Sequence, residues 1–239
     1  MSINQYDRFA EQYNQLMLGG YYDYDRQATA LEAVLPPGAS ILEIGVGTGL
    51  LAKALVDRGW KVAGMDHTAE MLEQARTLLG PDVRLEQADA TVFDLEQTFD
   101  AVISNGGVWY AVQDEGSELG YCGHLPTAEG VRASLQRVAA HLGPAGRLVL
   151  SVQHRHHDRA MSLPDDVEYR QTITDQGREG PIHAFDKEYR FDREGATVMS
   201  TTLRLAYIDT AWFEGELRAL GFGTPRQTED GQYVVFHRE

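Results

Sequence analysis

Residues 41–49 combine an apolar run with a glycine-rich turn that suits a nucleotide-like ligand. The segment reads Ile-Leu-Glu-Ile-Gly-Val-Gly-Thr-Gly, and a helical pattern follows over 50–58. Gly45, Gly47 and Gly49 let the backbone turn sharply and leave room for a ligand, because glycine has no Cβ. The start of the helix adds unpaired backbone N–H groups. We therefore expect a nucleotide-like ligand to bind at this turn.

A second group of polar residues follows the strand predicted over 147–153, and it reads His154-Arg155-His156-His157-Asp158. Histidine is the usual general base at neutral pH, and the carboxyl ends of parallel strands face the ligand site. We predict His154 as the catalytic base. A metal site made of His154, His156 and Asp158 is the alternative use of these residues. Because they lie in a predicted loop, we predict no metal.

Strand and helix patterns alternate through the first two thirds of the chain. The expected strands cover 40–44, 61–65, 83–87, 99–104 and 147–153, and the expected helices cover 50–58, 68–79 and 128–142. Two further helices are expected within 6–35, separated by Gly19-Gly20. Such alternation is typical of βαβ units. We predict an α/β fold whose doubly wound, mostly parallel, Rossmann-like sheet has seven strands.

After residue 154 the pattern changes to period-two alternation, which predicts an inserted antiparallel meander. The runs cover 167–173, 187–191 and 203–207, with turn signals at 175–177 and 193–195. A last helix over 211–220 and strands over 224–227 and 232–236 are expected to complete the sheet. The segment 111–126 is expected to be a mobile loop.

The chain of 239 residues is expected to form a single domain. Residues 1–37 would be a helical cap, 38–153 the ligand-binding core, 154–208 a lid or dimer surface, and 209–239 the elements that complete the sheet.

The composition excludes several classes of partner. Lys plus Arg total 21 against 36 Asp plus Glu, giving a net charge near −15, which argues against nucleic acid. No apolar stretch is long enough for a membrane span. The single cysteine, Cys122, fits a reducing compartment. We expect a cytoplasmic protein that does not bind membranes, and a homodimer is one assembly we consider.

The spacing of the glycines discriminates between two cofactors. A dinucleotide-binding fingerprint has the pattern G-x-G-x-x-G, but the sixth position here is Leu50. The spacing G-x-G-x-G, with Glu43 two residues ahead, resembles motif I of class I S-adenosylmethionine-dependent methyltransferases of the small-molecule type. In that family the turn surrounds the methionine part of the cofactor.

Further segments resemble the same family in the same order over roughly 40–150. Residues 66–72 resemble the pattern D-x-S-x-x-M-L, residues 87–90 end the third strand with an acidic residue, and 99–105 resemble the fourth-strand motif. The opening over 6–14 is similar to that of small-molecule methyltransferases, although Asn14 replaces the usual aspartate. The resemblance implies the following cofactor-binding residues: Tyr13, Glu43, Gly45, Val46, Gly47, Gly49, Asp66, His67, Met71, Asp89, Ala90 and Asn105.

Aromatic residues near these motifs are candidates for the acceptor pocket, namely Tyr22, Trp109 and Tyr110. The fourth strand continues Asn105-Gly106-Gly107-Val108, which differs from the Asn-Pro-Pro-Tyr motif of enzymes that methylate nucleobases. We expect methyl transfer from S-adenosylmethionine to nitrogen or oxygen of a small metabolite. The alternatives are an NAD(P)-dependent oxidoreductase and a non-catalytic cofactor-binding protein.

Overall fold

The computed structural model describes residues 14, 16, 17 and 22–239. Tyr13 and most of the first predicted helix therefore lie outside the described residues. The second predicted helix is α2, which covers Tyr24–Glu32 and begins at the N-cap Asp23. The Asp23 carboxylate accepts a hydrogen bond from the Arg26 backbone N–H at 3.0 Å, as expected of an N-cap aspartate.

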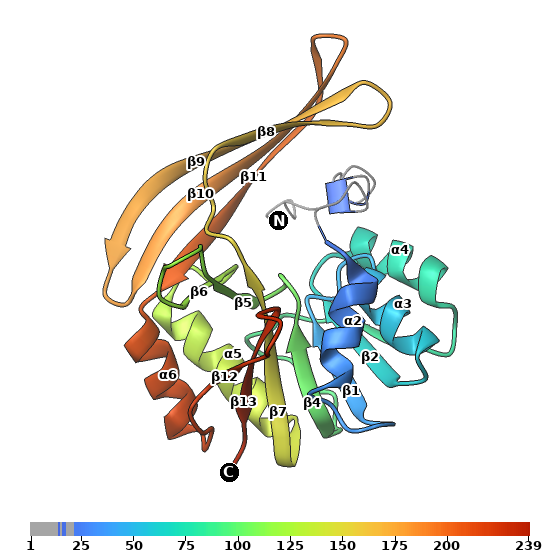
Figure 1. The fold of residues 1–239 in the computed structure, drawn as a ribbon, viewed down its shortest axis with the longest axis vertical. Helices are drawn as coiled ribbons and strands as arrows, with labels where there is room; N and C mark the ends of the chain where they lie inside the picture. The colour runs from blue at the N-terminus through green and yellow to red at the C-terminus, as the bar shows by residue number, and fades with distance from the viewer. Residues whose placement is uncertain (1–13, 15, 18–21) are drawn as a thin grey trace.

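The strands of the described chain form one continuous sheet (Figure 1). Its parallel part runs in the order β3-β2-β1-β4-β7. These strands are β1 Ser40–Ile44, β2 Lys61–Asp66, β3 Arg84–Gln87, β4 Phe99–Ser104 and β7 Leu142–Gln153. The antiparallel strands β13 (Tyr233–His237) and β12 (Arg226–Gln227) follow β7. Within the described residues these make up the predicted seven-stranded Rossmann-like sheet, which is confirmed.

Both faces of this parallel sheet are buried, which explains why its strands are continuous apolar runs. On β1, Leu42 and Ile44 belong to one apolar cluster and Ile41 to the other, because successive side chains point to opposite faces. Leu135 of α5 (Ala128–Ala140) and Phe213 of α6 (Thr210–Ala219) cover the first face. The second face is covered by three helices: α2, α3 (Leu50–Asp57) and α4 (Ala69–Leu79).

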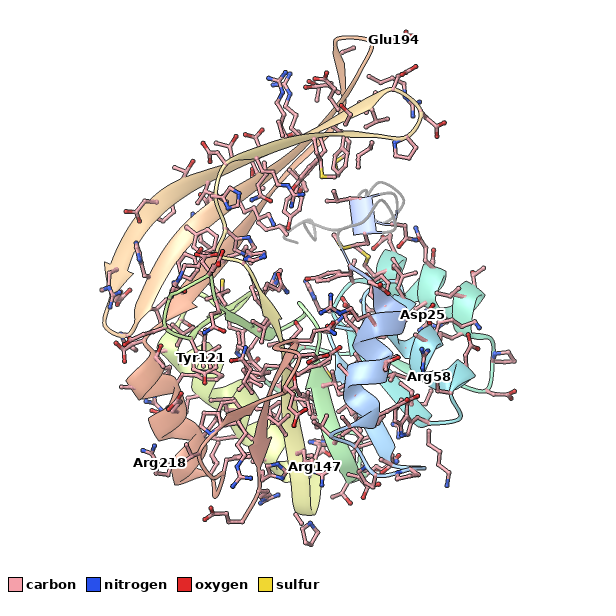
Figure 2. All side chains as sticks on the ribbon, in the orientation of Figure 1. Asp25, Arg58, Tyr121, Arg147, Glu194 and Arg218 are labelled. Carbon is pink, nitrogen blue, oxygen red and sulfur yellow. The ribbon has the colours of Figure 1, made fainter. Side chains whose placement is uncertain are left out.

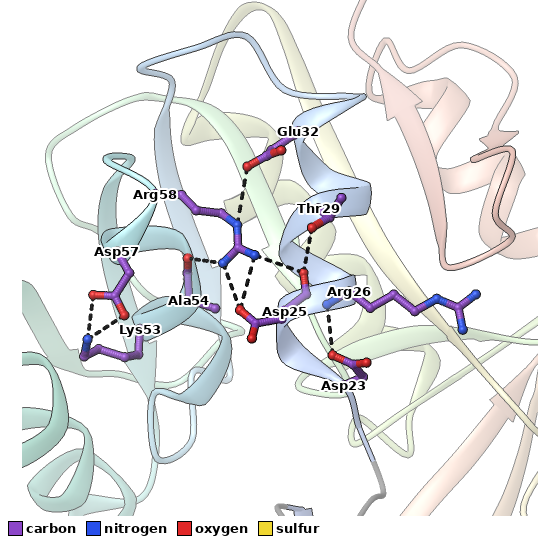
Figure 3. Close-up of polar contacts among 9 residues, drawn as sticks. All are labelled: Asp23, Asp25, Arg26, Thr29, Glu32, Lys53, Ala54, Asp57 and Arg58. Atoms are coloured by element: carbon purple, nitrogen blue, oxygen red, sulfur yellow. Dashed lines mark hydrogen bonds and ion pairs between the residues drawn. The ribbon is translucent and has the colours of Figure 1, made fainter.

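Polar contacts also join α2 to α3 (Figure 3). Beyond the end of α3, the Arg58 guanidinium donates to the Asp25 carboxylate at 3.2 Å and lies 3.4 Å from that of Glu32. Exposed ion pairs of this kind contribute little stability. The packing of Leu31 against the apolar side of α3 contributes more, because Leu31 is fully buried.

The sheet continues from β7 into a long antiparallel extension, which we call the arm. The arm consists of β8 Arg159–Leu163, β9 Val167–Glu179, β10 Ile182–Arg193 and β11 Ala196–Ile208. It stands out from the body, with Glu194 at its far end and Arg147 at the opposite end of the molecule (Figures 1 and 2). The predicted meander is present, and it has one more strand, β8, than the three predicted runs.

Two local predictions were wrong. The segment 111–126 is not a loop throughout, because β5 (Trp109–Val112) and β6 (Gly120–Gly123) pair with each other and connect β7 to β11. The turn expected at 175–177 lies beyond Glu179 instead, since β9 continues through Gly177 with a register shift. Both errors concern pairing between strands, which short sequence patterns do not specify.

No helix among the described residues is long and apolar enough to cross a membrane.

The turns after β1 and β4 touch each other backbone to backbone. A Cβ placed on Gly107 would lie 2.4 Å from the Ile44 carbonyl oxygen, and one on Gly45 would lie 2.7 Å from the Gly107 Cα. The order β3-β2-β1-β4 reverses direction between β1 and β4, and such a switch point is where ligands bind in doubly wound sheets. The absence of two side chains therefore lets these turns meet at the switch point.

Changing Gly107 to Ala should destabilise the protein, because the new Cβ would meet backbone atoms that cannot move aside. We expect a loss of about 2–3 kcal/mol and a fall in Tm of roughly 4–12 °C. Gly215→Ala in α6 is the matched control, because nothing lies within 4 Å of a Cβ there. Its Tm should stay the same or rise slightly. Equal thermal melts for the two variants would contradict the contact.

Candidate functional site

The turn after β1 is held by β2. The N–H groups of Gly45 and Val46 both donate to the Met65 carbonyl, at 2.8 and 2.9 Å. The Gly47 N–H donates to Asp66 Oδ2 at 3.0 Å. Gly47 has a φ of +55°, and no atom lies within 4 Å of the position its Cβ would occupy. The turn is thus fixed by its neighbouring strand while Gly47 stays open to a ligand.

Asp66 stands at the carboxyl end of β2 and lines a pocket of about 460 Å³. Its Oδ1 accepts the Thr68 N–H at 2.9 Å. Burial alone would raise the pKa of Asp66, but hydrogen bonds from His67, Thr68 and Gly47 outweigh it and hold the pKa below its usual range. Asp66 is therefore ionised, and its carboxylate oxygens can accept hydrogen bonds from the hydroxyls of a ribose. The pocket is lined by Gly45, Gly47, Asp66, His67, Met71, Gly106, Gly107, Val108 and His124.

Glu43 and Asn105 present two unsatisfied oxygens to an adjoining pocket of about 330 Å³, which Val46 also lines. Glu43 is 3% exposed, and its Oε2 lacks a hydrogen-bond partner among the described residues, as does Asn105 Oδ1. The Asn105 amide donates to Gln27 Oε1 of α2 at 3.1 Å, which orients the oxygen. Unsatisfied buried acceptors are costly, so this pair suits a ligand that carries N–H donors.

The pKa of Glu43 is raised because its carboxyl group is buried with few hydrogen-bond donors around it. Burial raises its pKa to about 8, the Ala52 backbone N–H lowers it, and the charge of Asp66 raises it further. A cationic group bound beside Glu43 would favour the charged carboxylate. The pocket that Asp66 lines and the pocket that Glu43 lines share three glycines, Gly45, Gly47 and Gly106, and therefore lie directly beside each other.

Three residues predicted to bind cofactor do not line these pockets. Gly49 is the N-cap of α3 with a φ of +84°, and a Cβ there would lie 2.9 Å from Leu79 of α4, so its role is helix packing. Asp89 Oδ1 accepts both the backbone N–H and the hydroxyl of Thr91 at 2.7 Å. Ala90 packs against the apolar core. Tyr13 lies outside the described residues, although its neighbour Asn14 accepts a hydrogen bond from Thr48 in the turn at 2.6 Å.

A third pocket of about 350 Å³ lies between the body and the arm. It shares Gly106 and His124 with the Asp66 pocket. Most of its lining carries hydrogen-bonding groups, and the full set is Met17, Tyr22, Gly106, Tyr110, His124, Gln153, His156, Lys187, Tyr189 and Leu205. Tyr22 and Tyr110, two of the predicted acceptor residues, are therefore brought together here.

The prediction of His154 as the catalytic base does not fit this geometry. Its side chain is 83% exposed and lies 3.5 Å from the Asp114 carboxylate, outside the pocket lining. His156, two residues on, lines the pocket instead, where its ring Nε2 lies 2.6 Å from the Tyr110 hydroxyl and its backbone N–H donates to the Tyr207 hydroxyl at 2.9 Å. One residue of the predicted histidine cluster therefore does line the pocket, but it is His156 and not His154.

Trp109 was also predicted to line the acceptor pocket, but it does not. It is fully buried in the core, where its ring lies 6.3 Å from that of Phe213 in an edge-on arrangement. Neighbouring residues of β5 point to opposite faces, so Tyr110 faces the pocket and Trp109 does not.

Several pocket residues were given no role from the sequence, among them Gly106, His124 and Lys187. For Lys187 the sequence did contain a signal, because the alternate positions 185, 189 and 191 around it are all aromatic. Among the described residues, no group of three or more histidine, cysteine, aspartate or glutamate side chains could hold a metal ion.

S-adenosylmethionine fits the donors and acceptors of the two adjoining pockets. Glu43 and Asn105 would accept from the amino group of its methionine part, and Asp66 from its ribose hydroxyls. Met71, which is 3% exposed, offers an apolar surface in the pocket that Asp66 lines. When bound, the cofactor supplies an activated methyl group.

Comparison with known proteins agrees with this fit. A family described as methyltransferase domain matches residues 41–146. The sugar enzyme dTDP-3-amino-3,6-dideoxy-alpha-D-glucopyranose N,N-dimethyltransferase of Streptomyces fradiae is 32% identical over 145 residues, covering 59% of this chain and 51% of the relative. The chain spans about half the length of the curated relatives it matches.

The fold is shared with solved structures over nearly the whole chain. Streptomyces venezuelae DesVI superposes with a TM-score of 0.70 at 21% identity, covering 100% of both chains. The S-adenosylmethionine-bound amino pentose methyltransferase CalS10 of Micromonospora echinaspora gives a TM-score of 0.66 at 21% identity, covering 95% of this chain and 97% of that one.

Replacing Glu43 by Gln should change how stability depends on pH. The pKa of Glu43 rises from 4.5 to about 8 on folding, so its contribution to stability is full below pH 4.5 and is lost as the pH rises to about 8. The Gln variant has no such loss. Without cofactor, E43Q should melt roughly 4–8 °C above wild type near pH 9, with a smaller difference near pH 5.

Thermal melts at both pH values check this, with the exposed Glu73→Gln as control. The same E43Q protein should bind S-adenosylhomocysteine more weakly, because the amide lacks the negative charge. A stability difference that is equal at the two pH values would contradict the raised pKa.

Proposed function

The chain carries a class I S-adenosylmethionine-dependent methyltransferase domain, and on this premise we propose that it methylates a nitrogen atom of a small-molecule amine. The observation that carries the proposal is that two pockets adjoin each other. The pocket of Asp66 and the pocket beneath the arm meet at Gly106 and His124. A methyl donor in the first can therefore present its methyl group to an acceptor in the second.

Methyl transfer from a sulfonium is an in-line displacement with an excellent leaving group, so the protein contributes mainly position and exclusion of water. Glu43, Asn105 and Asp66 would hold the donor, and the glycine turns leave room for it. The acceptor nitrogen uses its lone pair to bond the methyl carbon, while the carbon–sulfur electron pair returns to sulfur. Tyr22 and Tyr110 line the space in which the acceptor is positioned.

The polar lining of the arm pocket favours an acceptor rich in hydroxyl groups. Tyr22, Tyr110, Gln153 and His156 offer both donors and acceptors, and Gln153 Nε2 lacks a partner among the described residues. Relatives that methylate the amino group of a sugar support the same class. We therefore favour an amino sugar over an oxygen acceptor.

The alternatives are less well supported. An NAD(P)-dependent oxidoreductase would need the third glycine that Leu50 replaces, and the comparisons are with methyltransferases. A protein that binds the cofactor without catalysis is the remaining alternative, and it predicts binding without transfer.

Residues 1–37 and 154–208 would act as cap and lid over the core at 38–153, and 209–239 would complete the sheet. The homodimer, the cytoplasmic location and the exclusion of nucleic acid stay predictions from the sequence.

Two assays test the function. Isothermal titration should show binding of S-adenosylhomocysteine and none of NADH, and mass spectrometry should show the gain of a methyl group on a nucleotide-linked amino sugar. Binding of NADH in place of S-adenosylhomocysteine would favour the oxidoreductase. Cofactor binding with no methyl gain on any amine would favour the non-catalytic protein.

Asp66→Ala should weaken the binding of S-adenosylhomocysteine by about 1.5–3 kcal/mol, roughly 10- to 150-fold, because a charged acceptor is lost. Isothermal titration measures this, and circular dichroism checks that the variant is folded. The exposed Asp57→Ala, whose carboxylate pairs with Lys53, is the control and should bind like wild type. Unchanged affinity in the Asp66 variant would place the ribose elsewhere.

A further inference from the structure

The arm carries one lysine on its mostly apolar inner face. Lys187 of β10 pairs with Ile173 of β9 and Leu203 of β11. It is 2% exposed, and its neighbours along the same face, Phe185 and Tyr189, are also buried. A lysine is almost never buried to this extent, so its position needs an explanation.

The amine of Lys187 lies within a group of polar side chains. Its Nζ is 3.4 Å from His156 Nδ1 and 4.5 Å from the centre of the Tyr189 ring. His156 Nε2 is 2.6 Å from the Tyr110 hydroxyl, which the Cys122 thiol contacts at 3.2 Å. Lys187, His156, Tyr110 and Tyr189 all line the pocket beneath the arm. The lysine is therefore placed to contact whatever acceptor this pocket holds.

An amine acceptor brings a proton that must leave before the nitrogen can attack, because an ammonium has no lone pair. His154 is exposed and lies outside the pocket. Burial lowers the pKa of His124 to about 4 and that of His156 to about 2. Neither pocket histidine is therefore a good proton acceptor near neutral pH.

The surroundings of Lys187 favour its neutral form. Burial lowers its pKa to about 7, Cys122 raises it and the charge of Arg159 on β8 lowers it. His156 and His124 also face it, and the positive charge of Lys187 in turn lowers their pKa values. A base whose pKa lies near the working pH is well matched to proton transfer.

We infer that Lys187 is the group that accepts the proton of the acceptor ammonium, an inference that rests on the proposed N-methyl transfer. The proton passes from the acceptor nitrogen to Lys187 Nζ, which becomes an ammonium. The freed lone pair then forms the bond to the methyl carbon, and the carbon–sulfur pair stays with sulfur. Lys187 releases its proton to solvent after the product leaves.

His156 and Tyr110 are positioning residues in this arrangement. His156 is held by the Tyr207 hydroxyl on its backbone and by the Tyr110 hydroxyl on its ring. Its Nδ1 lies beside the lysine, so the neutral ring keeps Nζ in place without competing for the proton.

The first test measures the protonation of Lys187 directly. The chain has three lysines, Lys53, Lys61 and Lys187, so protein labelled with carbon-13 at lysine Cε gives three assignable signals. In the complex with S-adenosylhomocysteine, the signal absent from Lys187→Met should titrate with a midpoint near 7. The half-buried Lys53 and the exposed Lys61 serve as internal controls, and an unperturbed lysine has a pKa of about 10.4. A midpoint for Lys187 in that ordinary range would overturn the inference.

The second test is kinetic, with the amino sugar acceptor. Lys187→Met should lower kcat by about 10²- to 10⁴-fold and leave the affinity for S-adenosylhomocysteine within about twofold of wild type. Wild-type kcat should rise with pH through about 7, and this rise should vanish in Lys187→Met. Lys187→Arg keeps a cation but cannot accept a proton, so it should be equally impaired. Lys53→Met is the control and should match wild type.

The possible outcomes distinguish a failure of the role of Lys187 from a failure of the proposed N-methyl transfer. An active wild type whose Lys187→Met variant keeps its kcat and pH profile overturns the role of Lys187 alone. An active Lys187→Arg variant does the same. A wild type that binds S-adenosylhomocysteine but methylates no amine overturns the proposed function itself.

Discussion

The backbone contact between the turns after β1 and β4 is the constraint on which the rest of the site depends. Gly45 and Gly107 allow the two turns to meet where the strand order reverses. Because the turns are fixed against each other, Glu43 and Asn105 face one space from neighbouring strands. Any side chain at the contact would push these strand ends apart, and the oxygens that match the donor would no longer converge.

Charge is divided between the donor end and the acceptor end of the adjoining pockets. The carboxyl groups of Glu43 and Asp66 lie at the donor end. The Asp66 anion favours a cationic ligand there, and such a ligand in turn favours the ionised form of Glu43. Lys187 and two histidines that resist protonation lie at the acceptor end. A cationic acceptor is disfavoured there, so the amine is most stable once it has given up its proton. The electrostatics of the site thus select the donor as the cation and the acceptor as the nucleophile.

The sequence predicted what local patterns specify. The apolar strand and glycine turn at 41–49, the helix after it and the acidic end of β2 lie where the periodicity and spacing placed them. The choice among the histidines failed, because the contacts that hold His156 at the pocket come from distant residues, Tyr110 on its ring and Tyr207 on its backbone. Spacing within the histidine cluster does not specify such contacts. Trp109 and Tyr110 were both predicted to line the acceptor pocket, because the sequence pattern did not predict β5. This strand is defined by its pairing with β6 and β7, and its two neighbouring side chains point to opposite faces.

A crystal structure of the protein with S-adenosylhomocysteine tests the central assignment most directly. The amino nitrogen of the ligand should lie within hydrogen-bond distance of Glu43 Oε2 and Asn105 Oδ1, with its ribose hydroxyls on Asp66 and its sulfur directed toward the pocket of Lys187. Ligand density that leaves Glu43 and Asn105 without a partner, or that fills the pocket beneath the arm instead, would contradict it.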